Sequence, residues 1–529
     1  MHGDLSFPLT TRDINFAGIL EQQGRVSLDA DTNAATAIAL DWQDTEANDV
    51  IGSGVAAIPA DAPDSFLVSA AAVDGAGNVQ ISLTGGRAWV DGILVRLDDT
   101  VVNTRIATYL QPPVVPAPAP NATSIVAGTR DAIILEVWRD SLSSFQRPGL
   151  LLEPALGGPD TIERIHTSFD FRLLRLADGD DCGNLGSKLG DNLAAKGRLT
   201  VSLKATSVVP GPCPVNDAGG YTGFEHALYR IEIADVNAGG PMFKWSQFNG
   251  GLVGRGDFDG GAGIVTILAN LQPIITSGLP SFYLEALVPD IDGGGQPIFD
   301  RWRVSYGANV TLNANDELVL GATVFGNVPA HGTPTFFRLW NEIRACSDFP
   351  TGLANPNELI DGICLAFDPN AVGAYTPGDY WSFDVRAGNI LIDPLIIGGV
   401  PVLVNDQPPE GIRCHRVSLG IVTWPGPMPV AGTLSDCREP FQPLTRLDTC
   451  CTFRVGDGVH SHGQFTSINI ALQHLPAAGG KICVLPGEYN EHVLIDGLEN
   501  VIISGCGKRS RVLGDTTDPV FHIRDSWHI

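Results

Sequence analysis

The end of the chain, from residue 465 to residue 529, constrains the fold most, because short apolar runs recur there at nearly regular intervals. Gly, Asp and Asn turns separate the runs, and about twenty residues make one repeat. Such strands are typical of a solenoid, in which no single coil buries its own apolar face. We therefore predict the first coils of a right-handed parallel β-helix of the pectin-lyase-like type, with strands within residues 479–487, 492–495, 501–503, 512–513 and 520–523.

A helix is expected before the first of these strands, within residues 464–475. Its apolar residues lie at helical spacing on one face: Phe465, Ile468, Ala471, Leu472 and Leu475. This helix would cap one end of the solenoid, since terminal repeats need a cap. Residues 527–529 supply no closing segment at the other end. We expect the natural protein to continue beyond residue 529, so that the β-helix is truncated here.

The composition favours a mainly β protein. Only 17% of the residues are charged, whereas Gly (61) and Pro (37) are frequent. The net charge of −26 would repel nucleic-acid backbones and anionic lipid headgroups, so we expect neither partner. The first residues lack the pattern of a secretory signal peptide, and no apolar run is long enough for a transmembrane helix. In such a chain we expect the ten cysteines to be free, buried thiols.

The N-terminal segment predicts a helix that begins at Asp31 or Thr32 and runs through Trp42 towards Asn48. Residues 18–33, which include the string Gln22-Gln23-Gly24-Arg25, resemble the opening of an uncharacterised bacterial domain family. That family is often joined to a parallel β-helix and is found with phage-tail and contractile injection system genes. The resemblance continues in collinear motifs at residues 156–161, 220–232, 243–250 and 378–381.

The resemblance implies that the N-terminal arm and helix dock on a tail-like particle. The residues assigned to this docking are Gln22, Gln23, Arg25, Asp29, Asp31 and Trp42. Turn and linker signals suggest the domain organisation. We predict a docking arm and helix at 1–52, a small β-module at 53–111, a Pro-rich linker at 112–124, one or two large β-rich domains at 125–455, and a cap helix with β-helix coils at 456–529.

Two motifs in the large β-rich region contain polar groups that chemistry could use. Lys244 and Ser246 could form an activated nucleophile, but a strand with both side chains in solvent and Phe243 and Trp245 in the core is the favoured interpretation. Glu225 and Arg230 could pair near a ligand groove. A solvated contact of small value is again the favoured interpretation.

The densest group of Cys and His residues gives the zinc candidates Cys450, Cys451, His460 and His462. Their spacing matches none of the paired Cys-x-x-Cys patterns, so structural side chains are favoured, and we predict neither a metal nor a cofactor. The predicted coils contain carboxylates and histidines that a glycosidase or lyase could use. They are Glu488, Glu491, His492, Asp496, Asp515, Asp518, His522, Asp525 and His528. Turn chemistry explains several of them, and we assign no catalytic residue.

The sequence therefore predicts a structural component of a phage-tail-like particle or contractile injection system, similar to a tail fibre or tailspike. The N-terminal part would attach to a baseplate or another particle protein, and the β-helix would project to a cell-surface receptor or glycan. We expect a homotrimer, assembled in the cytoplasm, because three solenoids bury their flanks side by side. The alternative is a polysaccharide-degrading β-helix enzyme with accessory N-terminal domains. A free-standing cytoplasmic scaffold is a third, weaker option.

Overall fold

The structure is a computed structural model that divides the chain into two compact units, Met1–Phe441 and Gln442–Ile529. Strands dominate both units, so the predicted mainly β class is confirmed. The structure describes residues 5, 15–98, 103–112, 114–115, 119–153, 155, 161–189, 193, 196–205, 207–209, 215–217, 219–234, 240–291, 297–353, 355–368, 375–389, 395–427, 429–441, 451–476, 478–515 and 517–529.

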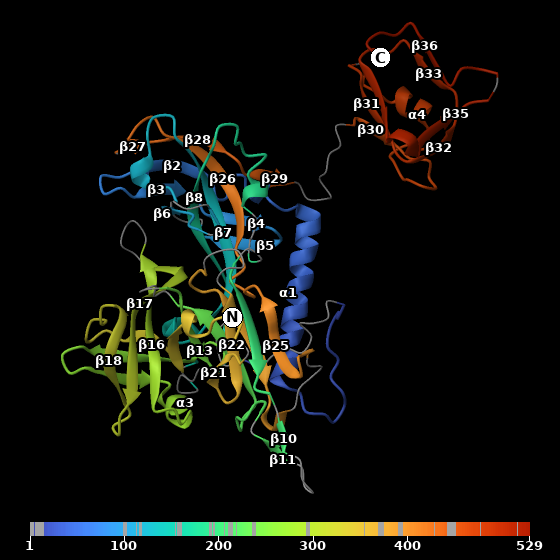
Figure 1. Cartoon of the computed structure of the whole chain (residues 1–529). Helices are drawn as coiled ribbons and strands as arrows, with labels where there is room; N and C mark the ends of the chain where they lie inside the picture. Colours follow the sequence, from blue (N-terminus) through green and yellow to red (C-terminus); the bar gives the residue numbers. More distant parts are fainter. Residues whose placement is uncertain are drawn as a thin grey trace. The chain divides into compact units, whose positions relative to one another are not determined.

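The first unit contains a sandwich of an eight-stranded and a four-stranded sheet (Figure 1). In spatial order the larger sheet is β27 (Val430–Ala431), β2 (Val68–Val73), β3 (Val79–Leu83), β6 (Asn103–Tyr109), β8 (Arg164–Arg175), β7 (Arg130–Leu142), β26 (His415–Thr423) and β28 (Thr433–Asp436). The smaller is β29 (Glu439–Phe441), β1 (Ala57–Pro59), β4 (Gly86–Val90) and β5 (Ile93–Leu97). Buried residues of both sheets, such as Val90 and Leu135, form one core.

The eight-stranded sheet combines strands from both sides of the Pro-rich stretch. β6 precedes the stretch and pairs in parallel with β8, which follows it, through Thr108 opposite Arg172. The predicted module at 53–111 and the predicted region from residue 125 therefore share this sheet. A Pro-rich composition indicates an extended chain but cannot tell whether the strands on either side pair with each other.

Two further sheets of the first unit share a second core. One is β20 (Glu342–Ala345), β13 (Met242–Ser246), β12 (Ala227–Ile233) and β23 (Tyr380–Val385), and the other is β21 (Asn357–Ile360), β22 (Ile363–Asp368), β9 (Arg198–Leu203), β25 (Val400–Gln407) and β24 (Leu395–Ile397). Ile231 and Trp381 of the first sheet pack in one cluster with Leu199 and Ile363 of the second. A two-stranded sheet consists of β10 (Ser207–Val209) and β11 (Val215–Asp217).

A six-stranded closed barrel completes the first unit. Its strands, in order, are β14 (Leu252–Asp259), β15 (Ile264–Ala269), β18 (Glu317–Gly326), β17 (Pro297–Leu312), β16 (Ser281–Ile291) and β19 (Thr335–Trp340). The α-helices of this unit are α1 (Asp29–Ile51), α2 (Pro148–Leu151) and α3 (Leu271–Thr276). Short 3-10 helices are η2 (Ala122–Ser124), η4 (Gly186–Lys188), η6 (Cys346–Asp348) and η7 (Ala387–Asn389).

The second unit pairs its strands in parallel. β31 (Gly480–Val484) lies between β30 (Phe453–Val455) and β34 (Val501–Gly505), while β32 (Gly487–Asn490) pairs with β35 (Ser510–Leu513) and β33 (Val493–Asp496) with β36 (Phe521–Arg524). Helix α4 (Ile468–Gln473), within the predicted cap segment, packs Ile468, Ala471 and Leu472 into the core of these strands. A 3-10 helix, η9 (Gly507–Arg509), precedes β35.

The cysteines differ from the prediction. Cys182 is bonded to Cys437 in the first unit, and Cys451 to Cys483 in the second, so the expectation of free thiols is wrong for these four residues. The members of each pair lie 255 and 32 residues apart, respectively. Sequence spacing cannot show that such distant residues meet.

Candidate functional site

The predicted docking residues lie on an arm and a helix with little contact to the rest of the unit. Gln22, Gln23, Arg25 and Asp29 are exposed, and the Trp42 side chain is 61% exposed. Asp31 has a different position: its carboxylate accepts a hydrogen bond from the Leu28 backbone N–H at 3.2 Å. Asp31 therefore satisfies a free N–H group at the start of α1, which makes it part of the helix cap.

The same segment also exposes apolar residues that were not predicted to take part in docking. We call residues 16–28 the apolar arm, because Leu20 is 94% exposed, Val26 85% and Leu28 54%. In α1, which has 23 residues, Ala34 alone is buried among the described side chains. Helices in proteins gain most of their stability from packing an apolar face, and exposed apolar groups gathered together mark interaction surfaces. The sequence contained a signal for this surface, because the apolar residues Leu20, Val26 and Leu28 lie on either side of Gln22-Gln23.

The second half of α1 is fixed to the sandwich. Arg139 of β7 donates from Nη2 to Asp44 Oδ1 at 2.8 Å. Asp91 and Gly92 form the turn that joins β4 to β5, and both residues have positive φ, as a type I′ turn requires. A Cβ on Gly92 would lie 2.1 Å from the Asp44 carbonyl oxygen, so only glycine allows this close approach of helix and turn. The unit thus holds the end of α1 and leaves its beginning and the arm uncovered.

The zinc candidates do not converge in the part of the chain that the structure describes. Cys451 forms a disulfide, and Cys450 lies outside the described residues. His460 Nδ1 is 2.6 Å from Asp457 Oδ2, and this carboxylate also accepts from the backbone N–H groups of Val459, His460 and Ser461. No group of three metal-binding side chains occurs among the described residues. His462 is exposed.

Four of the predicted solenoid carboxylates have structural partners. Glu488 pairs with Arg511 at 2.5 Å and Asp496 with Arg524 at 2.6 Å, each across two strands paired in parallel. Glu491 accepts hydrogen bonds from Ser467 Oγ, the Ile468 N–H and Asn469, so it fixes the start of α4. Asp515 accepts from Thr517 and lies 3.1 Å from His492 Nε2.

These contacts also bear on the chemistry of the carboxylates. The hydrogen bond from Arg524 lowers the pKa of Asp496, and that from Thr517 lowers the pKa of Asp515. A glycosidase acid needs the opposite, a raised pKa that keeps it protonated. The structure therefore gives neither Asp496 nor Asp515 the property of a general acid. His522 and Asp525 are exposed in and after β36, and His528 Nδ1 is 3.0 Å from Asn500 Oδ1. Asp518 is exposed.

The polar residues of β12 and β13 are buried, which corrects both sequence interpretations. Lys244 and Ser246, expected in solvent, are 4% and 0% exposed. Barrel strand β16 supplies Glu285, whose carboxylate lies 2.7 Å from Lys244 Nζ. Arg230, 1% exposed, pairs with Glu232 at 2.6 Å, while Glu225 is exposed. A buried charge must be paired, so these side chains form a structural network between the sheet and the barrel.

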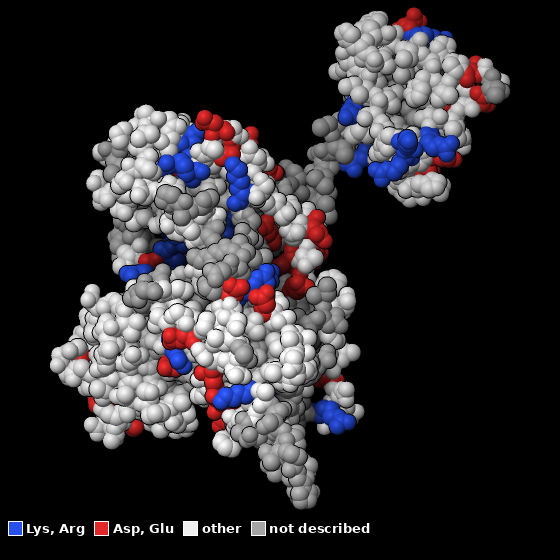
Figure 2. Space-filling model, viewed as in Figure 1, with Lys and Arg blue, Asp and Glu red and all other residues white. Residues whose placement is uncertain are grey.

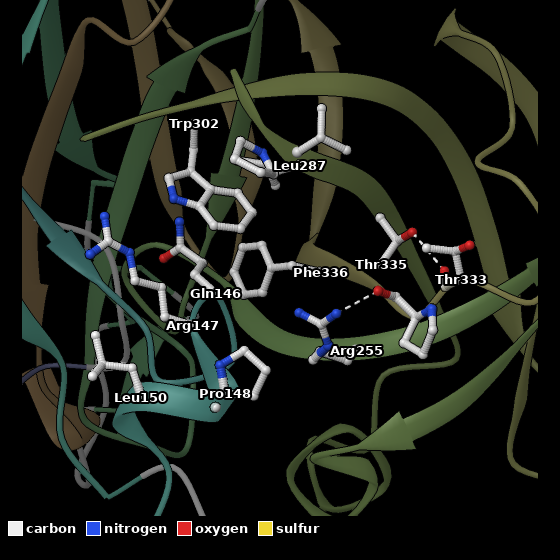
Figure 3. A pocket seen from close by; sticks show the side chains of 14 residues that line it. Gln146, Arg147, Pro148, Leu150, Arg255, Leu287, Trp302, Thr333, Thr335 and Phe336 are labelled. Carbon is white, nitrogen blue, oxygen red and sulfur yellow. Dashed lines mark hydrogen bonds between the residues drawn. The ribbon is translucent and has the colours of Figure 1, made fainter. Parts of the chain in front are cut away.

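A pocket of about 490 Å³ lies between the segment around α2 and the barrel (Figure 3). The Trp302 and Phe336 rings form an edge-to-face pair with centroids 5.9 Å apart. Arg255 reaches the pocket wall, where its Nη1 donates to the Phe145 carbonyl at 2.9 Å. Among the described residues that line it there is no His, Cys, Asp or Glu, and its aromatic and aliphatic side chains suit an apolar group.

One comparison with known protein families matches the N-terminal part of the chain. Residues 1–186 match a family of unknown function, DUF6519. This match spans the arm, α1 and the strands through β8. No curated protein and no solved structure matches the chain. Among the described residues, no helix is both long enough and apolar enough to cross a membrane. On the face in Figure 2, acidic and basic residues occur in small mixed groups separated by large uncharged areas.

Proposed function

We propose that this chain is a structural component of a phage-tail-like particle or contractile injection system, in which the first unit attaches and the second projects. The uncovered apolar arm and α1 carry the proposal: a 23-residue helix with Ala34 alone buried among its described side chains needs a further surface to pack against. The occupant is a particle protein, such as a baseplate subunit, with an apolar groove for Leu20, Val26 and Trp42.

The second unit, in this proposal, is the beginning of a right-handed parallel β-helix that serves as an adhesive rod. Three parallel strand pairs support it, since each strand of one turn pairs with a strand 21 to 28 residues further along, for example Gly480 with Val501 and Val493 with Phe521. Ion pairs such as Glu488–Arg511 link successive coils on the outside. Three such rods form a trimer and reach a receptor or glycan on a cell surface. The protein assembles in the cytoplasm and becomes part of the particle.

The alternative function is cleavage of a polysaccharide by the β-helix. The lowered pKa values of Asp496 and Asp515, and the use of Glu491 as a helix cap, favour the structural role over this alternative.

Co-sedimentation with native particles tests the proposal. The full chain carries an affinity tag in its natural host, and particles are isolated by density centrifugation and imaged. We expect the chain on particles and a trimer by light scattering. The double variant Leu20→Asp/Val26→Asp should abolish co-sedimentation without changing the mass of the purified protein in light scattering. Val126→Asp is the matched control, because Val126 is 59% exposed but lies outside the arm.

Two results would contradict the attachment role. One is a monomer that never sediments with particles and depolymerises a polysaccharide. The other is a Val126→Asp variant that loses attachment as completely as the arm variant, because the arm would then have no special part in docking.

A further inference from the structure

A second cavity of the first unit, of about 610 Å³, has a different chemistry from the pocket of Figure 3. Its wall includes strands β7, β8 and β26 of the eight-stranded sheet and the turn at residues 375–379 before β23. Three cationic side chains line it: Arg172, Lys196 and Arg416. Two carboxylates, Glu136 and Asp379, line the same cavity and pair with these cations.

Arg416 is the more enclosed of the two arginines in this wall, with 7% of its side chain exposed, compared with 29% for Arg172. Its Nε donates to Glu136 Oε1 at 2.7 Å, and Arg172 Nε donates to Glu136 Oε2 at 2.9 Å. Burial acts to raise the pKa of Glu136, but the two guanidinium groups outweigh it and hold this pKa below the usual range. One carboxylate therefore faces two arginines, and Arg172 also pairs with Asp170 at 3.1 Å.

The Nη1 atom of Arg416 is buried and donates to none of the residues that the structure describes. Thr376, on the turn at residues 375–379, lines the same cavity. Its hydroxyl is likewise buried and has no hydrogen-bond partner among the described residues. The turn itself is fixed, because the Thr376 N–H donates to Asp379 Oδ2 at 2.9 Å and Lys196 Nζ donates to Asp379 Oδ1 at 2.7 Å. Buried polar groups in native proteins nearly always have partners. Two such donors in one wall indicate a partner from outside the chain.

We propose that this cavity binds a small oxyanion, a carboxylate or a phosphate, with Arg416 as the charged donor and the Thr376 hydroxyl as the second donor. A guanidinium edge matches the two oxygens of such an anion and discriminates against halide ions. The motif at residues 378–381 then has a positioning role, because Asp379 holds the turn that carries Thr376. The proposal is independent of the attachment role of the arm.

Equilibrium dialysis of the full chain tests the site, with radiolabelled phosphate and radiolabelled citrate as the two probes, at constant ionic strength set with chloride. We expect one molecule of one probe per chain, and the probe that binds distinguishes phosphate from carboxylate. Arg416→Ala should weaken binding about tenfold or more, as loss of a charged hydrogen bond does, and Thr376→Val about threefold. Circular dichroism checks that both variants fold.

The thiol of Cys414, which lines the same cavity, gives a second readout. The bound probe should slow alkylation of Cys414 without changing alkylation of Cys506, an exposed cysteine of the second unit. Absence of binding for both probes to the wild-type chain would overturn the proposal. So would binding that Arg416→Ala and Thr376→Val both leave unchanged, because the anion would then occupy another site.

Discussion

The two units use charged side chains in opposite ways. The first unit buries Lys244, Glu232 and Glu285 between a sheet and a barrel, each with at most 5% of the side chain exposed. The second unit keeps pairs such as Glu488–Arg511 at its surface, with side chains 48% and 59% exposed. Strand direction differs as well: nearly all described pairs of the first unit are antiparallel, and those between the named strands of the second are parallel.

The difference follows from how each unit builds its core. Layers in the first unit come from distant parts of the chain, so a polar residue on one strand can be covered by another sheet and then requires a charged partner. In the second unit, each strand pairs in parallel with a strand 21 to 29 residues further along, and the paired charges of Glu488–Arg511 and Asp496–Arg524 remain at the surface. The first unit should therefore be the more sensitive to loss of a single charged group. The following predictions test that contrast.

The largest effects are expected from the disulfides. In the chain-entropy account, Cys182→Ser/Cys437→Ser should lower the free energy of unfolding of the first unit by about 5 kcal/mol, and Cys451→Ser/Cys483→Ser that of the second by about 4 kcal/mol, because the first bond closes the longer loop. Hydrogen exchange followed by mass spectrometry separates the two units. A larger loss from the second pair would contradict loop closure as the cause.

Loss of a buried charge should rank next. Glu285→Ala leaves Lys244 and the Trp340 N–H without the carboxylate that they contact at 2.7 and 2.8 Å. We expect the first unit to lose about 3–5 kcal/mol in chemical denaturation. Glu488→Ala, which breaks an exposed pair of the second unit, should cost less than about 1 kcal/mol. Equal costs would remove the contrast between the units.

A smaller effect is expected at the cap of α4. Glu491→Ala removes the acceptor for Ser467 Oγ and the Ile468 N–H, so the second unit should lose about 1–2 kcal/mol in thermal unfolding. Glu491→Gln should restore part of this, since the amide oxygen still accepts. Glu499→Ala is the control, an exposed carboxylate of the same unit. If Glu499→Ala were equally costly, the effect would be one of net charge and not of capping.

The smallest effect concerns pH. The hydrogen bond between Asp457 and His460 lowers the pKa of Asp457 and raises that of His460. The aspartate contribution is lost as pH falls through its folded pKa, and the histidine contribution is lost as pH rises through its folded pKa. Both contributions to stability are fully present between about pH 4 and pH 6.5, which are the pKa values of aspartate and histidine in the unfolded chain.

Titration of His460 by NMR checks this pair. Asp457→Asn should return the His460 pKa to about 6.5, the ordinary histidine value. His474 is a control in the same unit, because its ring nitrogen contacts the Ile470 carbonyl and no carboxylate among the described residues. An unchanged His460 pKa in Asp457→Asn would show that the backbone loop, and not the carboxylate, sets the value.

Much of the local structure could be predicted. The strand around Lys244, the helix within residues 464–475 and the strands expected within residues 479–523 all occur. Each depends on residues within one short segment, where β-branched side chains, turn residues and apolar spacing act directly.

The environment of those elements could not be predicted. The strand pattern at Phe243-Lys244-Trp245-Ser246 implied that one face met solvent, yet a barrel strand 41 residues further along covers the face of Lys244. The same limit applies to Arg416, which pairs with Glu136 of β7, 280 residues earlier. Alternation shows which residues share a face, but not what packs on that face.

The sequence by itself determined that this protein is mainly β, where many of its strands and turns lie, and that a Gln-Gln segment precedes the first helix. Only the tertiary structure decided that four cysteines are bonded, that the Pro-rich stretch separates strands of one sheet, and that the arm and the beginning of α1 remain uncovered. The physical reason is range: dihedral preferences and side-chain spacing act over a few residues, whereas burial, pairing of charges and disulfide formation depend on segments brought together by the whole fold.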